Sequence, residues 1–196
     1  MRAREEVEVR VIAGIAKGRT LVAPKGRQVR PTTDRVRQSM MDILAGWTAE
    51  RDWLDLFAGS GSVGIEALSR GARRVVFVEQ DRRALEALLA NLRRTGLEAG
   101  AEVRHQPVER ALVDLADGGG RFDVIFADPP YEQGLVEATV RRVVASGIVR
   151  DGGLLVVQHS AREQPLPPAG WRIRRQVPFG ETQVTILTAA DEEGDR

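Results

Sequence analysis

The sequence contains no cysteine, only two histidines (His105 and His159) and no apolar run that approaches the 18 residues needed to cross a bilayer. Without cysteine it can form no disulfide, thiolate zinc site or iron–sulfur cluster, and it has no thiol nucleophile. The first ten residues carry charges where a signal peptide requires an apolar run. We therefore expect a soluble, cytoplasmic protein without a metal site, and we assign neither histidine a catalytic role.

Positive charge is concentrated near the N-terminus, although the net charge is only +1. Residues 9–37 contain eight cations and one acid, Asp34, whereas residues 191–196 contain four acids and one arginine. A basic segment on a nearly neutral body favours a local contact with a polyanion. A solvated charged surface is the alternative, because arginine outnumbers lysine 27 to 2 throughout the chain and a coding bias would give the same pattern.

Apolar runs alternate with helix-period stretches after the basic segment, which is typical of βαβ units that feed a parallel sheet. The pattern predicts helices between five strands, which span 53–57, 74–79, 102–105, 122–127 and 154–158. Two further strands, 171–177 and 183–188, predict a hairpin around Pro178-Phe179-Gly180. We expect an α/β, Rossmann-like domain over residues 49–189, with a seven-stranded, mostly parallel sheet and a terminal antiparallel hairpin.

Residues 1–48 are expected to form a basic arm attached to this domain. Segments 7–13 and 19–23 predict a small β-ribbon. After Arg30-Pro31-Thr32-Thr33-Asp34 comes an amphipathic helix, and Thr33 is its candidate N-cap. The apolar residues of that helix are Val36, Met40, Ile43 and Leu44. At the other end of the chain, residues 190–196 are expected to form an acidic, disordered tail.

A glycine-rich loop follows the first predicted strand at residues 55–64 (DLFAGSGSVG). Gly59 and Gly61 allow backbone N–H groups to approach a ligand closely at a helix N-terminus. Glu79 ends the next predicted strand, 24 residues after Asp55, and is placed to accept both hydroxyl protons of a ribose. Both features are typical of nucleotide-binding α/β folds.

The glycine spacing also satisfies the G-x-G-x-x-G pattern of dinucleotide oxidoreductases, so that class is an alternative. Asp55 favours S-adenosylmethionine (SAM), because its carboxylate can reach a methionine ammonium and would repel a diphosphate. A tight strand-to-helix turn without any ligand is the third interpretation.

The tetrapeptide Asp128-Pro129-Pro130-Tyr131 follows the fourth predicted strand. Its prolines fix φ and make a rigid corner at the carboxyl end of a parallel strand, where α/β folds bind ligands. The exocyclic amine of a nucleobase is a poor nucleophile, because its lone pair is delocalised into the ring. If Asp128 and the Pro129 carbonyl each accept one N–H, the nitrogen can pyramidalise toward a sulfonium methyl. Tyr131 offers an aromatic face that stabilises an extruded base by about 1–3 kcal/mol.

This corner needs neither a metal nor a covalent intermediate. The lack of cysteine argues against C5 methylation of pyrimidines, which begins with thiolate attack. A proline-rich turn that only ends a strand is the alternative interpretation.

Three segments together resemble the bacterial 16S ribosomal RNA guanine-N2 methyltransferase family known as RsmD: residues 30–37 (RPTTDRVR), 55–61 (DLFAGSG) and 128–131 (DPPY). The resemblance extends in order over roughly residues 9–188. It implies a class I SAM-dependent methyltransferase fold and the transfer of one methyl group to the exocyclic N2 of a guanine in 16S rRNA. It also implies a small-subunit assembly particle as substrate, and we expect a monomer.

The resemblance also implies roles for individual residues. The implied SAM-binding residues are Asp55, Phe57, Gly59, Ser60, Gly61, Glu79, Gln80, Gln106, Val108 and Asp128. The implied catalytic residues, which present the guanine, are Asp128, Pro129 and Tyr131. The implied RNA-binding residues are Arg30, Thr32, Thr33, Arg35, Pro130 and Tyr131. The chain departs from its relatives at Gln106-Pro107-Val108, where they often carry a polar side chain near the adenine, so we expect a backbone contact at Val108.

Three other functions compete with this one. A DNA adenine-N6 methyltransferase uses the same corner but usually needs a separate target-reading domain, for which about 50 N-terminal residues are few. A glutamine-N5 protein methyltransferase typically has asparagine in place of Asp128 and needs no basic arm. A non-catalytic RNA-binding protein would keep the arm but would not need Asp128. A flipped guanine in structured RNA demands less of the protein, since the shape of the RNA supplies much of the specificity.

Overall fold

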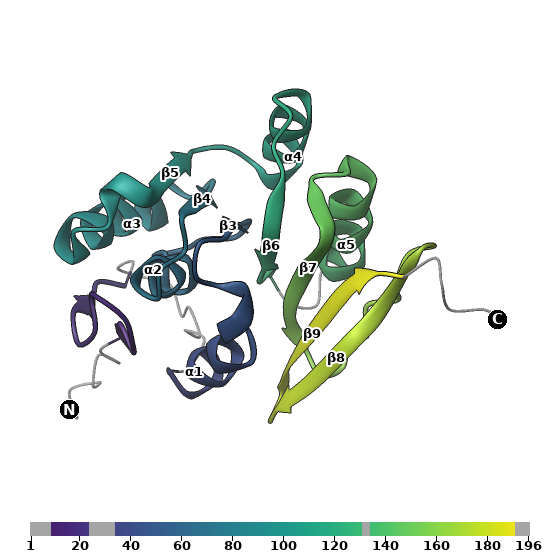
Figure 1. Ribbon diagram of the computed structural model, residues 1–196, viewed down its shortest axis with the longest axis horizontal. Coiled ribbons are helices and arrows are strands. Elements are labelled where there is room, and N and C mark those ends of the chain that lie inside the picture. Colours follow the sequence, from purple (N-terminus) through teal and green to yellow (C-terminus); the bar gives the residue numbers. More distant parts are fainter. Residues whose placement is uncertain (1–8, 24–33, 131–133, 191–196) are drawn as a thin grey trace, which may run out of the picture.

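The computed structural model describes residues 9–23, 34–130 and 134–190. Its central element is a seven-stranded sheet in the order β5-β4-β3-β6-β7-β9-β8 (Figure 1). Five neighbouring strands are parallel: β5 (Ala101–Arg104), β4 (Arg74–Val78), β3 (Asp52–Asp55), β6 (Phe122–Ala127) and β7 (Val149–Ser160). The remaining two are antiparallel: β9 (Thr182–Ala189) and β8 (Trp171–Phe179). The predicted α/β fold, with its terminal antiparallel hairpin, is confirmed.

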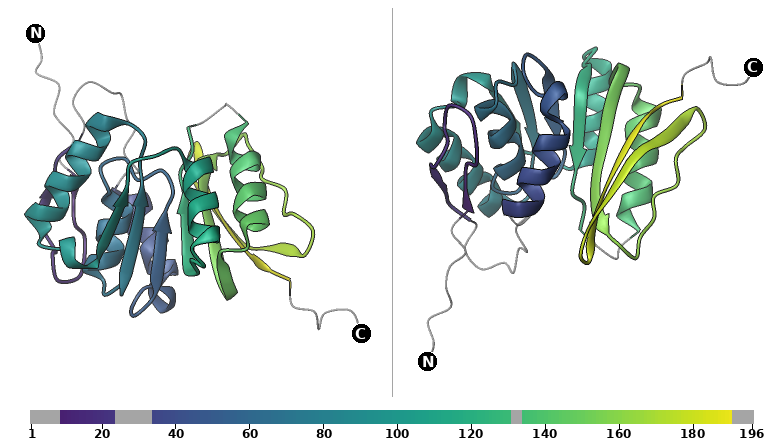
Figure 2. Two further views of the ribbon diagram at one scale, coloured as in Figure 1. Left: turned by 90° about the horizontal axis from the view of Figure 1, so that it is seen from above. Right: turned by 60° about the horizontal axis from the view of Figure 1, so that its bottom comes forward.

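Helices cover both faces of the sheet (Figure 2). One face packs against α1 (Asp34–Ile43), α2 (Ser62–Ser69) and α3 (Arg82–Thr95). The other face packs against α4 (Val108–Asp117) and α5 (Leu135–Ser146). Short 3₁₀ helices, η1 (Ala45–Trp47) and η2 (Glu98–Gly100), precede β3 and β5. Within the described ranges, no helix combines the length and the apolar character that a membrane crossing requires.

The sequence accounts well for α3. Asp81 is its N-cap and accepts hydrogen bonds from the backbone N–H groups of Arg83 and Ala84. Gly96, with φ of +71°, ends the helix in the left-handed conformation that favours glycine. Not every leucine of the helix is buried, since Leu89 is exposed. The buried face contains Ala84, Ala87, Leu88, Asn91, Leu92 and Thr95.

Most predicted strand boundaries are off by one or two residues, and β7 begins at Val149, five residues before its predicted start. Two of the differences have a clear cause. The first parallel strand ends at Asp55 and not at Phe57, because the chain already turns into the glycine loop there. Pro178 and Phe179 were predicted in the hairpin turn but belong to β8, where they pair with Gln183 and Thr182. A proline is tolerated at this position because β8 is the edge strand.

The N-terminal ribbon is shorter than predicted and packs against the domain. Its strands, β1 (Val9–Arg10) and β2 (Thr20–Leu21), are antiparallel, and the ribbon lies beside α2 and α3 (Figure 2). Glu66, a fully buried residue of α2, accepts the N–H groups of Ile12 and Ala13. The apolar side chains of the ribbon therefore share one hydrophobic core with α1 and the sheet.

Arg37 belongs to the basic N-terminal segment of the sequence but is fully buried. Its guanidinium donates to Asp34 Oδ1 at 2.9 Å and to the Arg10 carbonyl, and its Nε lies 4.0 Å from Glu66 Oε2. These contacts fasten α1 to the ribbon and to α2. Arg37 therefore does not contribute to an exposed basic surface.

Candidate active site

The glycine loop joins β3 to α2 at the carboxyl edge of the parallel strands. Gly59 and Gly61 have φ of +56° and +84°, which lie in the left-handed region that favours glycine. A Cβ atom at Gly61 would lie 2.3 Å from Leu88 Cδ1, and one at Gly64 would lie 2.2 Å from Phe77 Cε1. A Cβ at Gly59 would meet nothing within 4 Å. Gly61 and Gly64 thus allow close packing inside the fold, whereas Gly59 lies on the open side of the loop.

Asp55 ends β3 with its carboxylate buried under the glycine loop. Its Oδ2 accepts the N–H of Gly64 at 3.3 Å, whereas Oδ1 has no hydrogen-bond partner among the described residues. Burial raises the pKa of Asp55 to about 7; the hydrogen bond from the Gly64 N–H opposes this change, and the nearby carboxylates of Asp128 and Glu79 add to it. A buried, unpartnered oxygen costs about 1–3 kcal/mol, so this atom is suited to a ligand that brings a donor or a positive charge.

Glu79 directly follows β4 and links the glycine loop to the start of α3. Its Oε2 accepts the N–H of Gly59 at 2.7 Å, and its Oε1 accepts the N–H of Asp81 at 2.7 Å. Each carboxylate oxygen has a second lone pair, so the side chain can still accept hydrogen bonds from a ligand. The binding of ribose hydroxyls by Glu79 stays a prediction.

Asp128 directly follows β6, on the strand next to that of Asp55. Its Oδ2 accepts a hydrogen bond from Gln158 Nε2 of β7 at 3.1 Å. Burial raises the pKa of Asp128 to about 7, although the hydrogen bond from Gln158 opposes this change. Pro129 is buried and Pro130 is exposed, whereas Tyr131 lies outside the described residues.

Gln158 was not identified from the sequence. It is 3% exposed and lies beside Asp128 because β6 and β7 pair in parallel with Ala127 opposite Val157. This register depends on contacts between segments that are 30 residues apart. The polar side chain at the end of an apolar run, in VVQHS, was the available signal.

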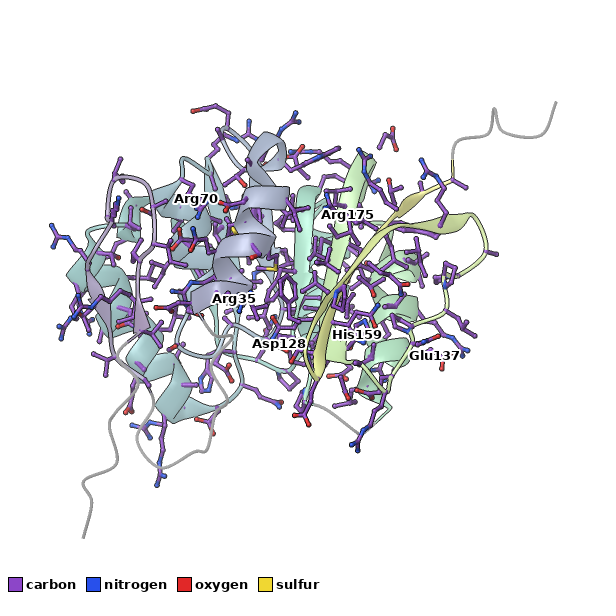
Figure 3. The ribbon with its side chains drawn as sticks, turned by 90° about the horizontal axis from the view of Figure 1, so that it is seen from below. Arg35, Arg70, Asp128, Glu137, His159 and Arg175 are labelled. Carbon is purple, nitrogen blue, oxygen red and sulfur yellow. The ribbon has the colours of Figure 1, made fainter. Side chains whose placement is uncertain are left out.

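Three carboxylates thus gather at the ends of the adjacent strands β4, β3 and β6: those of Glu79, Asp55 and Asp128. Such a concentration of negative charge favours a cation. Figure 3 shows Arg35, on the first turn of α1, and Asp128 toward one edge of the sheet, with Arg70, the C-cap of α2, toward the opposite edge. Arg35 is exposed.

The remaining predicted cofactor residues lie on the loops at this edge. Phe57, Ser60 and Gln106 are half-buried, and Gln80 is exposed. Val108 opens α4, whose N-cap, Pro107, makes no side-chain hydrogen bond to the helix. The backbone N–H groups of this first turn are therefore not capped by the side chain of Pro107, and the backbone contact at Val108 stays a prediction.

Four of the predicted substrate residues lie outside the described residues: Arg30, Thr32, Thr33 and Tyr131. Neither histidine belongs to the carboxylate cluster. His159 is fully buried, donates from Nδ1 to the Ser160 carbonyl at 2.8 Å and contacts Thr185 Oγ1 through Nε2 at 2.8 Å. His105 donates from Nε2 to the Gln80 carbonyl at 3.2 Å.

A parallel sheet with a glycine loop and acidic residues at the carboxyl ends of adjacent strands defines the Rossmann-like class that includes SAM-dependent methyltransferases. The family model named Conserved hypothetical protein 95 matches residues 9–188. The chain is 39% identical over 180 residues to YlbH of Bacillus subtilis (strain 168), covering 91% of this chain and 97% of that protein.

It is also 38% identical over 177 residues to Ribosomal RNA small subunit methyltransferase D of Escherichia coli (strain K12), covering 89% of this chain and 86% of that protein. The solved structure of yhhF from Escherichia coli matches with a TM-score of 0.81 at 34% identity, covering 93% of this chain and 98% of that one. The chain belongs to the RsmD/YlbH family of SAM-dependent methyltransferases. The family predicted from the sequence is confirmed.

Proposed function

We propose that the protein transfers a methyl group from SAM to the exocyclic N2 of a guanine in the 16S rRNA of the small ribosomal subunit. The observation that carries the proposal is the position of Asp128. Its carboxylate lies at the end of β6, next to β3, the strand that leads into the glycine loop. Its Oδ2 accepts a hydrogen bond from Gln158. The name of the Escherichia coli relative, which assigns it to small-subunit ribosomal RNA, supports the choice of substrate.

The described residues fit SAM. The unpartnered Oδ1 of Asp55 suits the ammonium group of its methionine, and Glu79 suits the ribose. When bound, SAM supplies a methyl group activated by a positive sulfonium. The remaining contacts fall to the loops, with Phe57, Gly59, Ser60 and Gly61 on one side and Gln80, Gln106 and Val108 near the adenine.

On the acceptor side, Asp128 and the Pro129 carbonyl would each accept one N–H of the guanine amine. Gln158 donates to Asp128 Oδ2, and Oδ1 accepts from none of the described residues, so we assign Oδ1 to the substrate. An ionised carboxylate stabilises the positive charge that develops on the nitrogen. Because its pKa is about 7, Asp128 can also hold the proton that the methylated nitrogen releases. Tyr131 and Pro130 would stack against the extruded base.

The RNA would approach from the side of the arm, residues 1–48. Arg35 supports this, since it is exposed and lies toward the same edge of the sheet as Asp128 (Figure 3). Arg30, Thr32 and Thr33 belong to the same proposal. In this division residues 49–189 form the methyltransferase domain and residues 190–196 an acidic tail. We further propose that the protein acts as a monomer on an assembling small subunit.

The test uses SAM with a labelled methyl group and four acceptors: small subunits that lack the modification, naked 16S rRNA, duplex DNA and a release-factor protein. We expect label in small subunits or 16S rRNA, and N2-methylguanosine after digestion to nucleosides. Asp128→Ala is the control for adventitious transfer. Label only in DNA, as N6-methyladenine, or only in protein would contradict the proposal and favour one of the two competing enzymes.

A further inference from the structure

Asn91 is the only asparagine in the sequence, and it lies fully buried on α3. It is outside the carboxylate cluster, and none of the proposed roles includes it. A buried side-chain amide in the middle of a helix needs hydrogen-bond partners, because an unmatched amide costs about 1–3 kcal/mol. The partners of Asn91 are therefore informative.

The amide of Asn91 joins two segments that are far apart in the sequence. Its Oδ1 accepts the N–H of Val22 at 2.7 Å, and its Nδ2 donates to the Val22 carbonyl at 2.9 Å. The same Nδ2 donates to the Ser60 carbonyl at 2.9 Å. Carbonyl oxygens can only accept, so these partners fix the orientation of the amide and use both of its hydrogens.

The two segments are those that the proposed reaction needs to bring together. Val22 directly follows β2 of the N-terminal ribbon, and Ser60 lies in the glycine loop between Gly59 and Gly61. Leu88, one turn earlier on α3, packs where a Cβ atom of Gly61 would be. The helix α3 therefore holds the loop by packing through Leu88 and by a hydrogen bond through Asn91.

Other contacts of the ribbon go to the C-terminal parts of α2 and α3. The N–H groups of Ile12 and Ala13 bond to Glu66, the N–H of Ala16 bonds to Ser69 Oγ at 3.0 Å, and Arg19 donates to the Arg94 carbonyl. These contacts fasten the ribbon to the domain without touching the glycine loop. The contact through Asn91 differs from them because it includes the loop.

We propose that Asn91 is a positioning residue that couples the N-terminal arm to the cofactor loop, so that RNA bound by the arm and SAM bound by the loop strengthen each other. The RNA part of this inference rests on the proposed function. A fixed Ser60 carbonyl holds the loop in one conformation, and a fixed Val22 holds the end of the ribbon against α3. By linkage, each ligand then changes the affinity of the other by the same factor.

The first experiment needs no variant. Selective labelling with [15N]asparagine gives one side-chain amide signal, because the chain has a single asparagine. We expect this signal to shift and its hydrogen exchange to slow when SAM is added, and to change again when a 16S rRNA fragment that is methylated in the assay above is added. A signal that neither ligand changes would overturn the inference.

The second experiment measures the Kd of SAM by calorimetry with and without the RNA fragment. We expect the RNA to lower the Kd of the wild-type protein about fivefold. Asn91→Ala should raise the Kd of SAM about tenfold. In this variant the ratio of the Kd of SAM without RNA to that with RNA should be close to one. Asn91→Asp keeps the size of the side chain and the acceptor for Val22 but puts an oxygen against two carbonyls, so it should act in the same direction.

Thr95→Val is the matched control. Thr95 is buried one turn later on α3, and its hydroxyl bonds only to the Asn91 and Leu92 carbonyls of the helix itself, in the contacts that the structure describes. This variant should lose stability but keep both the SAM affinity and the effect of RNA. If Asn91→Ala behaves like Thr95→Val, Asn91 only stabilises the fold and the inference is wrong.

The outcomes also separate this inference from the proposed function. If the wild-type protein methylates 16S rRNA and Asn91→Ala keeps the full effect of RNA on SAM, the inference fails and the function stands. If no RNA is bound or methylated, the proposed function and the coupling both fail. The SAM affinity of Asn91→Ala then decides separately whether Asn91 positions the loop.

Discussion

Aspartates lie at both ends of strands β3 and β6, and their surroundings differ between the two ends. We call the side of the sheet where the parallel strands begin the amino edge, and the side where they end the carboxyl edge. At the amino edge, Asp52 accepts hydrogen bonds from Arg73 at 2.6 Å and from Arg150 at 2.9 Å. Asp123 accepts from Arg150 at 2.6 Å and from the Asp52 N–H at 2.9 Å. The hydrogen bond from Arg73, with the help of Arg150, holds the pKa of Asp52 below its ordinary value against the effect of burial.

At the carboxyl edge, Asp55 and Asp128 have no arginine partner among the described residues, and burial raises the pKa of each to about 7. Aspartates on the same two strands are therefore paired with arginines at the amino edge, whereas at the carboxyl edge they have no arginine partner among the described residues. The amino edge thus holds the sheet together, whereas the carboxyl edge keeps its negative charge for a ligand.

The largest difference between the edges should appear in catalysis. We expect Asp128→Asn to lower single-turnover methyl transfer by about 10²–10⁴-fold, because the amide is a weaker acceptor and cannot stabilise the charge on the nitrogen. SAM binding should weaken by no more than about tenfold, because the variant also removes one of the negative charges of the cluster. Asp123→Asn, at the start of the same strand, is the matched control and should keep the rate per folded molecule. Equal losses of methyl-transfer rate in the two variants would contradict the difference in role between the two edges.

The second prediction concerns the pH dependence of SAM binding. The carboxylates of Asp55 and Asp128 are protonated below their pKa of about 7, and a protonated acid no longer attracts the positive charges of SAM. For each group that must ionise, the Kd of SAM should rise about tenfold between pH 8 and pH 6. S-adenosylhomocysteine, which lacks the sulfonium charge, should respond less. Calorimetric Kd values that are flat over this range would show that the cluster does not bind the cation.

The third prediction contrasts stability at the two edges. The folded-state pKa of Asp55 is above its unfolded value, so at pH 8 folding buries an ionised carboxylate and thereby loses stability. Asp55→Asn should therefore raise the free energy of unfolding at pH 8 by about 1–3 kcal/mol, while weakening SAM binding. The gain should shrink as the pH falls below 7 and vanish near pH 4.

Asp52→Asn should do the opposite, because the pKa of Asp52 is lowered in the folded state. It should destabilise the protein above pH 4, and this loss should disappear at lower pH, where the wild-type carboxyl is also neutral. Urea unfolding of both variants across pH measures the two effects. The same sign for both variants at pH 8 would contradict the account.

The smallest effect is expected at Gln158. Its amide donates to Asp128 and thereby favours the ionised carboxylate. Gln158→Leu should move the acid limb of the kcat/KM profile upward by about 0.5–1 pH unit and lower the rate at pH 7 only a few-fold. An unchanged profile with a lower rate at every pH would mean that Gln158 supports the fold and not the ionisation of Asp128.

Much of the fold and part of the site could be predicted from local sequence. The glycine loop, Glu79 and the corner at Asp128 lie at strand ends that are marked by apolar runs and turn residues, so their common edge follows from the parallel topology. Gln158 and Asn91 could not be found in this way. Their roles depend on the register between β6 and β7 and on the packing of α3 against the ribbon, which no local pattern encodes.

The most direct test of the account is a ¹³C NMR titration of the aspartate carboxyl groups without and with SAM, with signals assigned through Asp→Asn variants. The account predicts that Asp55 and Asp128 titrate near pH 7 without the cofactor and at clearly lower pH with it, whereas Asp52 titrates below the ordinary range of an aspartate in both cases. Titration of all three groups at or below 4, with no change on adding SAM, would contradict the claim that the carboxyl edge holds its charge for the cofactor and the amine.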